Sequence, residues 1–122
     1  MKKIENKRKF TDAWFKFLQL QICNHFQNLE NNLAKKKNIK SKIFLEKKWF
    51  KRKIKEGGGT SFILRNGLIF DKVGVNQSTV SGQFKKKFRS KILGAEKNGK
   101  YWASGISVVA HMKNPKIPAI HF

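Results

Sequence analysis

The sequence predicts an α+β protein in which helices flank an antiparallel β-sheet. Two observations support this fold class. Residues 10–34 show the spacing of one amphipathic helix, and residues 49–122 contain β-branched and aromatic runs separated by turn signals. Because the helical pattern precedes the strand runs, the elements are segregated along the chain, as in α+β folds. The length of 122 residues fits a single domain.

The N-terminal part predicts one amphipathic helix preceded by a charged segment. We expect residues 1–9 to be a frayed lead-in and Thr11 to be the N-cap of a helix over residues 10–34. Apolar residues recur every three or four positions and share one helix face: Trp14, Leu18, Ile22, Phe26, Leu29 and Leu33. This stripe is expected to dock on a large apolar surface, with Cys23 as a small buried side chain.

The middle of the chain predicts a linker, a short mixed segment and the first strands. Residues 35–42 indicate a solvated linker, and residues 44–50 end in a basic stretch. Gly57-Gly58-Gly59 predicts a flexible turn, with an anion-binding loop as the less favoured alternative. Asn66-Gly67 lies between two apolar runs and predicts a β-hairpin in which both residues have positive φ.

The C-terminal part predicts further strands and a proline-bearing loop. We expect a strand or loop over residues 75–82, a connection or short helix over residues 83–100 and a strand over residues 102–111. Pro115 and Pro118 then favour an extended loop, because residues before proline avoid the α region.

Charge and cysteine content restrict the class of protein. The chain has 28 Lys+Arg against 7 Asp+Glu, a formal net charge of +21, and its charge attracts polyanions without selecting one. A single cysteine cannot form an intramolecular disulfide, and no apolar run reaches the roughly 20 residues of a membrane span. We therefore expect a cytoplasmic protein without a membrane span.

The candidates for chemistry lie near the C-terminus. His111 and His121 are ten residues apart across the proline-bearing loop, so both can face one cavity as acid–base groups or metal ligands. No Cys or carboxylate stands at ligand spacing beside them, so the spacing alone does not support a metal. Ser107 lies within a predicted strand and lacks the Gly-x-Ser-x-Gly pattern of a serine nucleophile. His25, in the predicted helix, is favoured as an interfacial side chain.

A nucleic-acid surface is the alternative to an enzyme site. The basic stretch at residues 47–55 interleaves lysines with Trp49 and Phe50, which fits both a nucleic-acid surface and a solvated face. The residues therefore leave open a small Lys-rich nucleic-acid-binding protein. If the chain is not such a protein, we expect nucleic acid to bind to it only non-specifically, through charge.

From Trp49 onward, several motifs occur in a fixed order. They are Gly57-Gly58-Gly59-Thr60-Ser61, Asn66-Gly67-Leu68-Ile69-Phe70-Asp71-Lys72-Val73-Gly74-Val75-Asn76, Ser78-Thr79-Val80-Ser81-Gly82, and Gly105-Ile106-Ser107 with His111, Asn114-Pro115 and His121. This order and spacing resemble the oxygen-dependent coproporphyrinogen III oxidase family. Three positions depart from the family pattern: Glu56 replaces a glycine, Asp71 a glutamate and Met112 a proline.

The resemblance implies a reaction and roles for site residues. The family converts two propionates of coproporphyrinogen III into vinyl groups and gives protoporphyrinogen IX in heme biosynthesis. It uses O₂ as co-substrate and no organic cofactor, and the intact enzyme is a homodimer. By match, Ser107 contacts the substrate, His121 is the proton donor, and His111 and His121 are candidate ligands of a divalent metal.

The resemblance also implies that residues 1–122 are a single incomplete domain, the N-terminal portion of the family's fold. In the family, a substrate-binding Asn-x-Arg begins two positions after the histidine that matches His121, whereas this sequence stops at Phe122. We therefore expect a truncated oxidase that is inactive alone and folds marginally. A fragment that works only with a separate C-terminal half is a further hypothesis.

Overall fold

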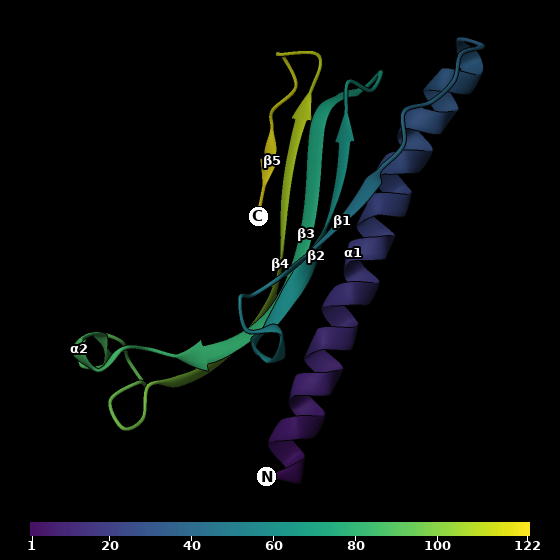
Figure 1. Cartoon of the computed structure of the whole chain (residues 1–122). Coiled ribbons are helices and arrows are strands. Elements are labelled where there is room, and N and C mark those ends of the chain that lie inside the picture. Colours follow the sequence, from purple (N-terminus) through teal and green to yellow (C-terminus); the bar gives the residue numbers. More distant parts are fainter.

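The computed structural model describes residues 1–122 and places one long helix on one face of a five-stranded antiparallel sheet (Figure 1). The elements are α1 (Lys2–Lys36), β1 (Leu45–Phe50), a 3₁₀ turn η1 (Ile54–Glu56), β2 (Gly57–Arg65), β3 (Phe70–Gln83), α2 (Lys86–Arg89), β4 (Lys100–Met112) and β5 (Ile120–His121). The strand order β1-β2-β3-β4-β5 follows the chain, so each strand pairs with its neighbour in sequence. The predicted α+β class is confirmed.

Helix α1 is longer than the sequence analysis predicted. It begins at Lys2, so the frayed lead-in over residues 1–9 and the N-cap at Thr11 are both wrong. The Thr11 hydroxyl donates to the carbonyl of Lys7, 2.8 Å away, as a side chain inside a helix does. Residues 2–9 are exposed and half of them are lysine, a residue of high helix propensity, and the guanidinium of Arg8 lies 5.5 Å from the ring centroid of Trp102. Neither helix is long and apolar enough to cross a membrane.

The face of α1 that contacts the sheet is more polar than the predicted stripe. Ile22 and Phe26 pack against the core, but Trp14 and Leu29 of the stripe are about half exposed. The most buried helix residues are Gln19, Cys23, Glu30 and Ala34. The stripe is therefore only partly correct, because polar side chains that bond to the sheet occupy the centre of the contact.

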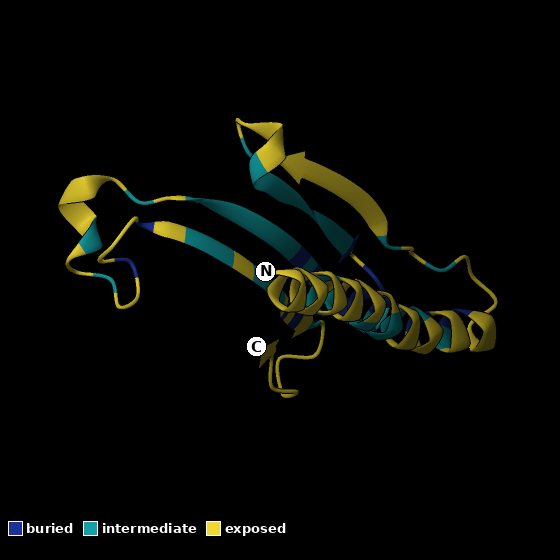
Figure 2. Cartoon of the chain, turned by 90° about the horizontal axis from the view of Figure 1, so that it is seen from below, coloured by how far each residue is buried: buried dark blue, intermediate teal, exposed yellow.

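The core lies between α1 and one face of the sheet. Alternate residues of the central strands point toward the helix, and together with Cys23 they form the core: Leu64, Phe70, Val73, Val75, Val108 and Ala110. Cys23 is buried, as predicted, and burial raises the pKa of its thiol to about 12. Only 14 of the 122 residues are buried, so the core is thin and one-sided (Figure 2).

The glycine run is the start of a central strand, and the predicted flexible turn is wrong. Gly57, Gly58 and Gly59 pair with β3, and the last two also pair with β1. A Cβ on Gly58 would lie 2.1 Å from the carbonyl oxygen of Trp49, and a Cβ on Gly57 would lie 2.1 Å from that of Thr79. Glycine at these positions therefore lets the backbones of the neighbouring strands approach closely. The anion-loop alternative is also wrong, because the segment is a strand.

The β2–β3 hairpin is confirmed, but its turn differs from the two-residue type. Four residues, 66–69, connect the strands, and the Gly67 amide donates to the carbonyl of Phe70, 2.8 Å away. Asn66 has a φ of 53°, whereas Gly67 does not have a positive φ. Gly67 is needed for another reason: a Cβ there would lie 2.3 Å from a carboxylate oxygen of Glu30.

The carboxylate of Glu30 fastens this turn to α1. It is fully buried and accepts hydrogen bonds from the amides of Leu68 (2.7 Å), Ile69 (2.8 Å) and Phe70 (2.8 Å). Charge-assisted bonds of this kind compensate the cost of burying the charge. Gln19 makes a similar link, since its amide donates to the carbonyls of Thr60 (2.8 Å) and Val75 (3.0 Å).

The C-terminal elements largely follow the prediction. Strands β3 and β4 contain the segments expected over residues 75–82 and 102–111, and the short helix α2 lies within residues 83–100. Residues 113–119 form a non-helical loop around the two prolines, as expected. The sequence analysis missed β5, because two residues carry too little pattern to predict a strand.

Candidate active site

Strand alternation divides the sheet into two faces. Successive side chains of a strand point to opposite sides, and Val108 and Ala110 of β4 point to α1. Ser107, Val109 and His111 therefore point to the other side, which no helix covers. We call this side the open face.

The structure brings His111 and His121 into contact on the open face. Their Nε2 atoms are 2.9 Å apart, and their ring centroids are 5.0 Å apart at 54°. His121 pairs with Val109 in the β4–β5 ladder, and the Phe122 amide donates to the carbonyl of Val108, 3.0 Å away. Strand β5 thus holds His121 on the same side of the sheet as His111.

The contact between the two imidazoles has a definite protonation requirement. An Nε2–Nε2 hydrogen bond needs one ring to donate and the other to accept, so at least one Nε2 carries no proton. Both side chains are exposed and can therefore reach a ligand on the open face. The pair can take a proton from a bound molecule or give one to it, and can pass it between the rings.

Ser107 shares the face but does not join the pair. It is exposed, and no hydrogen bond connects it to either histidine. It lies two residues from Val109, the partner of His121, which is about 7 Å along a strand. Asn76 on β3 lies opposite Ser107, so a ligand that spans both sites would also contact this amide.

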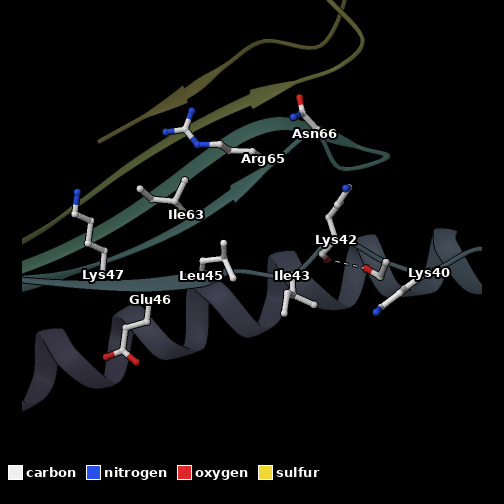
Figure 3. Close-up of a pocket in the computed structure, with 10 residues that line it drawn as sticks. Lys40, Lys42, Ile43, Leu45, Glu46, Lys47, Ile63, Arg65 and Asn66 are labelled. Atoms are coloured by element: carbon white, nitrogen blue, oxygen red, sulfur yellow. Dashed lines mark hydrogen bonds between the residues drawn. The ribbon is translucent and has the colours of Figure 1, made fainter.

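Two hollows lie on the open face. The first, which we call the histidine hollow, has a volume of about 440 Å³ and is lined by Ile63, Asp71, Lys72, Gly74, Asn76, Val109 and His111. The second, which we call the β1–β2 hollow, has a volume of about 680 Å³ and is lined by Lys40, Ser41, Lys42, Ile43, Leu45, Glu46, Lys47, Ile63, Arg65 and Asn66 (Figure 3). The two hollows share Ile63, so they form one continuous surface.

The lining of the β1–β2 hollow has a net positive charge, whereas the histidine hollow contains one lysine and one aspartate, Lys72 and Asp71. The β1–β2 hollow contains four basic side chains and one carboxylate, that of Glu46, which lies 3.7 Å from Lys48. Of the basic residues in the lining, the sequence drew attention only to Lys47, as part of the basic stretch at residues 47–55. Ile63 and Arg65 are two residues apart on β2, so strand alternation puts both side chains on the same face. Which other basic residues share that face becomes clear only once the register of the strands is known.

The residues present do not complete a metal site. His111 and His121 offer two nitrogens, and no group of three or more His, Cys, Asp or Glu side chains gathers anywhere in the chain. A catalytic zinc site, for comparison, uses three protein ligands. A metal on this pair would need further ligands from water or from other polypeptide.

Comparisons with known proteins give one consistent result. The family profile described as coproporphyrinogen III oxidase matches residues 10–122. Proteins named oxygen-dependent coproporphyrinogen-III oxidase from Rickettsia typhi and Rickettsia prowazekii are each 49% identical over 119 residues, which cover 97% of this chain and 41% of the relative. The Rickettsia felis protein of the same name is 46% identical over 120 residues. The chain thus spans about 41% of the length of these curated relatives.

Proposed function

This chain belongs to the coproporphyrinogen III oxidase family, and on that premise we propose that it supplies the histidine pair of an oxygen-dependent oxidative decarboxylation. The resemblance in its motifs is thereby confirmed. No observation favours the alternative of a small nucleic-acid-binding protein. The substrate we propose is coproporphyrinogen III, whose four propionates make it a tetra-anion.

The chemistry balances with O₂ as the oxidant. Each propionate that becomes a vinyl group loses CO₂, one proton and two electrons, and O₂ accepts the electrons. Removing the proton from a pyrrole N–H makes the ring rich enough in electrons to react with O₂. The chain's part in this step is to hold and move the proton.

The observation that carries the proposal is the contact between His111 and His121. With the Nε2–H of His121 donated to Nε2 of His111 across 2.9 Å, the free Nδ1 of His121 accepts a proton from the substrate or returns one, and the hydrogen bond fixes the orientation of the ring. Ser107, on the same face, contacts the substrate through its hydroxyl. The cationic lining of the β1–β2 hollow attracts the tetra-anion.

Several finer features belong to the same proposal. We assign the whole enzyme a homodimeric state and a cytoplasmic location. The single buried and unpaired thiol, Cys23, suits the reducing environment of the cytoplasm. A divalent metal bound by His111 and His121 stays a prediction, and its remaining ligands would come from water or from other polypeptide.

We also propose that residues 1–122 are one incomplete domain. The N-terminal half of α1 leaves Phe10, Trp14 and Phe17 at least half exposed on the side away from the sheet. Apolar surface of this kind is normally covered. The chain alone is therefore expected to be inactive and marginally folded.

The test combines this chain with the part of the Rickettsia typhi relative that lies beyond its match. O₂ uptake and protoporphyrinogen formation from coproporphyrinogen III are measured for each part alone and for the two co-expressed. We expect no turnover by either part and measurable turnover by the pair. A pair that associates but forms no product would overturn the proposed function, and turnover by this chain alone would overturn its inactivity.

A further inference from the structure

We propose that the β1–β2 hollow binds the carboxylate arms of an amphipathic polycarboxylate, with Arg65 as its main anion ligand and Leu45 and Ile63 as its apolar contacts. This proposal rests on the proposed function. It names the part of the chain that holds those carboxylate arms of the substrate that lie away from the histidine pair.

The register of the sheet places Arg65 in line with the histidines. His111 on β4 lies opposite Lys72 on β3, and Lys72 lies opposite Arg65 on β2. Adjacent strands are about 4.8 Å apart, so Arg65 and His111 are separated by about 10 Å across the open face. A ligand of tetrapyrrole size can therefore touch the histidine pair and the hollow together.

An apolar row runs beside this cationic row. His121 lies opposite Val109, and the ladder continues through Gly74 and Ile63 to Leu45. All five positions share the open face, because paired residues of antiparallel strands point to the same side. The flat body of a ligand can lie on this row while its arms reach the charges at either side.

The cations of the hollow have no carboxylate partner within the chain. The three ion pairs of the protein join Lys16 to Asp12, Lys48 to Glu46, and Lys51 to Glu56, so neither Arg65 nor Lys47 is paired. Figure 3 shows Lys47 and Arg65 projecting from β1 and β2 on the same side. The guanidinium of an unpaired arginine fits a carboxylate in a bidentate manner.

The apolar contacts favour an amphipathic ligand over nucleic acid. Leu45 and Ile43 are 67% and 62% exposed between the cations. No aromatic side chain lines the hollow, whereas non-specific binding of single-stranded nucleic acid relies on aromatic stacking. A molecule that combines an apolar body with acidic arms satisfies both kinds of surface.

The turn that carries Arg65 is held in place. The amide of Asn66 donates to the carbonyl of Asp71, 2.8 Å away, and the buried carboxylate of Glu30 accepts from the amides of Leu68, Ile69 and Phe70. The backbone under Arg65 is thus fixed before a ligand arrives, which reduces the entropic cost of binding.

The test measures binding of coproporphyrin III, a stable tetracarboxylate, by its change in absorption and fluorescence. Mesoporphyrin IX, with two carboxylates, and a single-stranded oligonucleotide serve as comparison ligands. Variants Arg65→Gln and Lys47→Gln remove one charge each from the hollow. Lys48→Gln is the matched control, because it removes the same charge from the next residue of β1 on the opposite face. Far-UV circular dichroism checks that each variant folds like the parent chain.

We expect the parent chain to bind coproporphyrin more tightly than mesoporphyrin. Relative to the parent, Arg65→Gln should weaken the binding of coproporphyrin about fivefold to tenfold, and Lys47→Gln about twofold. The control should change the affinity little. Equal losses for Lys48→Gln and Arg65→Gln, no binding of coproporphyrin, or tighter binding of the oligonucleotide through Arg65 would overturn the proposal. Because this assay requires no turnover, its failure is distinct from failure of the co-expressed pair to form product.

Discussion

The two faces of the sheet differ in what their polar residues do. On the face covered by α1, the buried polar side chains Gln19, Glu30 and Gln77 all have hydrogen-bond partners, and no buried side-chain polar atom is left without one. On the open face, Ser107 and Arg65 have no partner in the chain, and His111 and His121 bond only to each other.

This difference separates residues that stabilise the fold from residues that are free to bind. A buried polar group must be satisfied internally, so its removal costs stability. An exposed polar group without a partner contributes little to stability, and a cluster of such groups points to a ligand. The comparison therefore predicts large stability effects on the covered face and small ones on the open face.

The largest expected effect comes from Glu30. Glu30→Ala leaves three amides, one of them buried and two partly buried, without an acceptor, and we expect a loss of about 3 to 5 kcal/mol in the free energy of unfolding or a failure to fold. Glu30→Gln retains one acceptor oxygen and should lose less. Urea unfolding followed by circular dichroism measures both. A Glu30→Ala variant within about 0.5 kcal/mol of the parent, the error of such unfolding data, would break the comparison.

A pair of neighbouring residues on β2 tests the two faces directly. Leu64 is fully buried against α1, whereas Ile63 points to the open face and is only partly buried. We expect Leu64→Ala to cost about 2 to 4 kcal/mol, and Ile63→Ala no more than about 1 kcal/mol. Thermal or urea unfolding of the two variants under the same conditions gives the answer, and equal losses would contradict the assignment of faces.

A smaller effect is expected from the pH dependence of Asp12. Burial favours its neutral form, but hydrogen bonds from Lys16 and Thr79 outweigh burial and hold the pKa of Asp12 below its ordinary value of 3.8. The contribution of Asp12 to stability is thus present above that value and is lost as the pH falls through the lowered pKa. We expect less than about 1 kcal/mol. Unfolding at pH 5 and pH 3 should show a weaker pH dependence for Asp12→Asn, and an unchanged dependence would exclude this role.

The sequence predicted the helix and most of the strands, because each has a local signal. Period 3.6 marks α1, and alternating apolar residues mark β4. The buried positions of Gln19 and Glu30 had no such signal, because their partners lie about 40 residues or more away in sequence. For the same reason the need for Gly67 beside Glu30 could not be read from the turn alone.

The candidate site was predictable in part. The spacing of His111 and His121 across a proline-bearing loop indicated that they could share a cavity, and the structure brings them to 2.9 Å. The β1–β2 hollow was not predictable, since Lys47 and Arg65 come to line one hollow only through the pairing of β1 with β2. Register across strands depends on the whole sheet and is not written in any one segment.

The most direct test of the open face as the reacting surface is the rate of protoporphyrinogen formation after His121→Ala in the co-expressed pair. His25→Ala is the control, because His25 is an exposed histidine on α1. We expect His121→Ala to lower the rate at least about 100-fold while the free energy of unfolding changes by less than about 0.5 kcal/mol, and His25→Ala to change neither. An undiminished rate for His121→Ala, or equal losses for both histidines, would contradict the account.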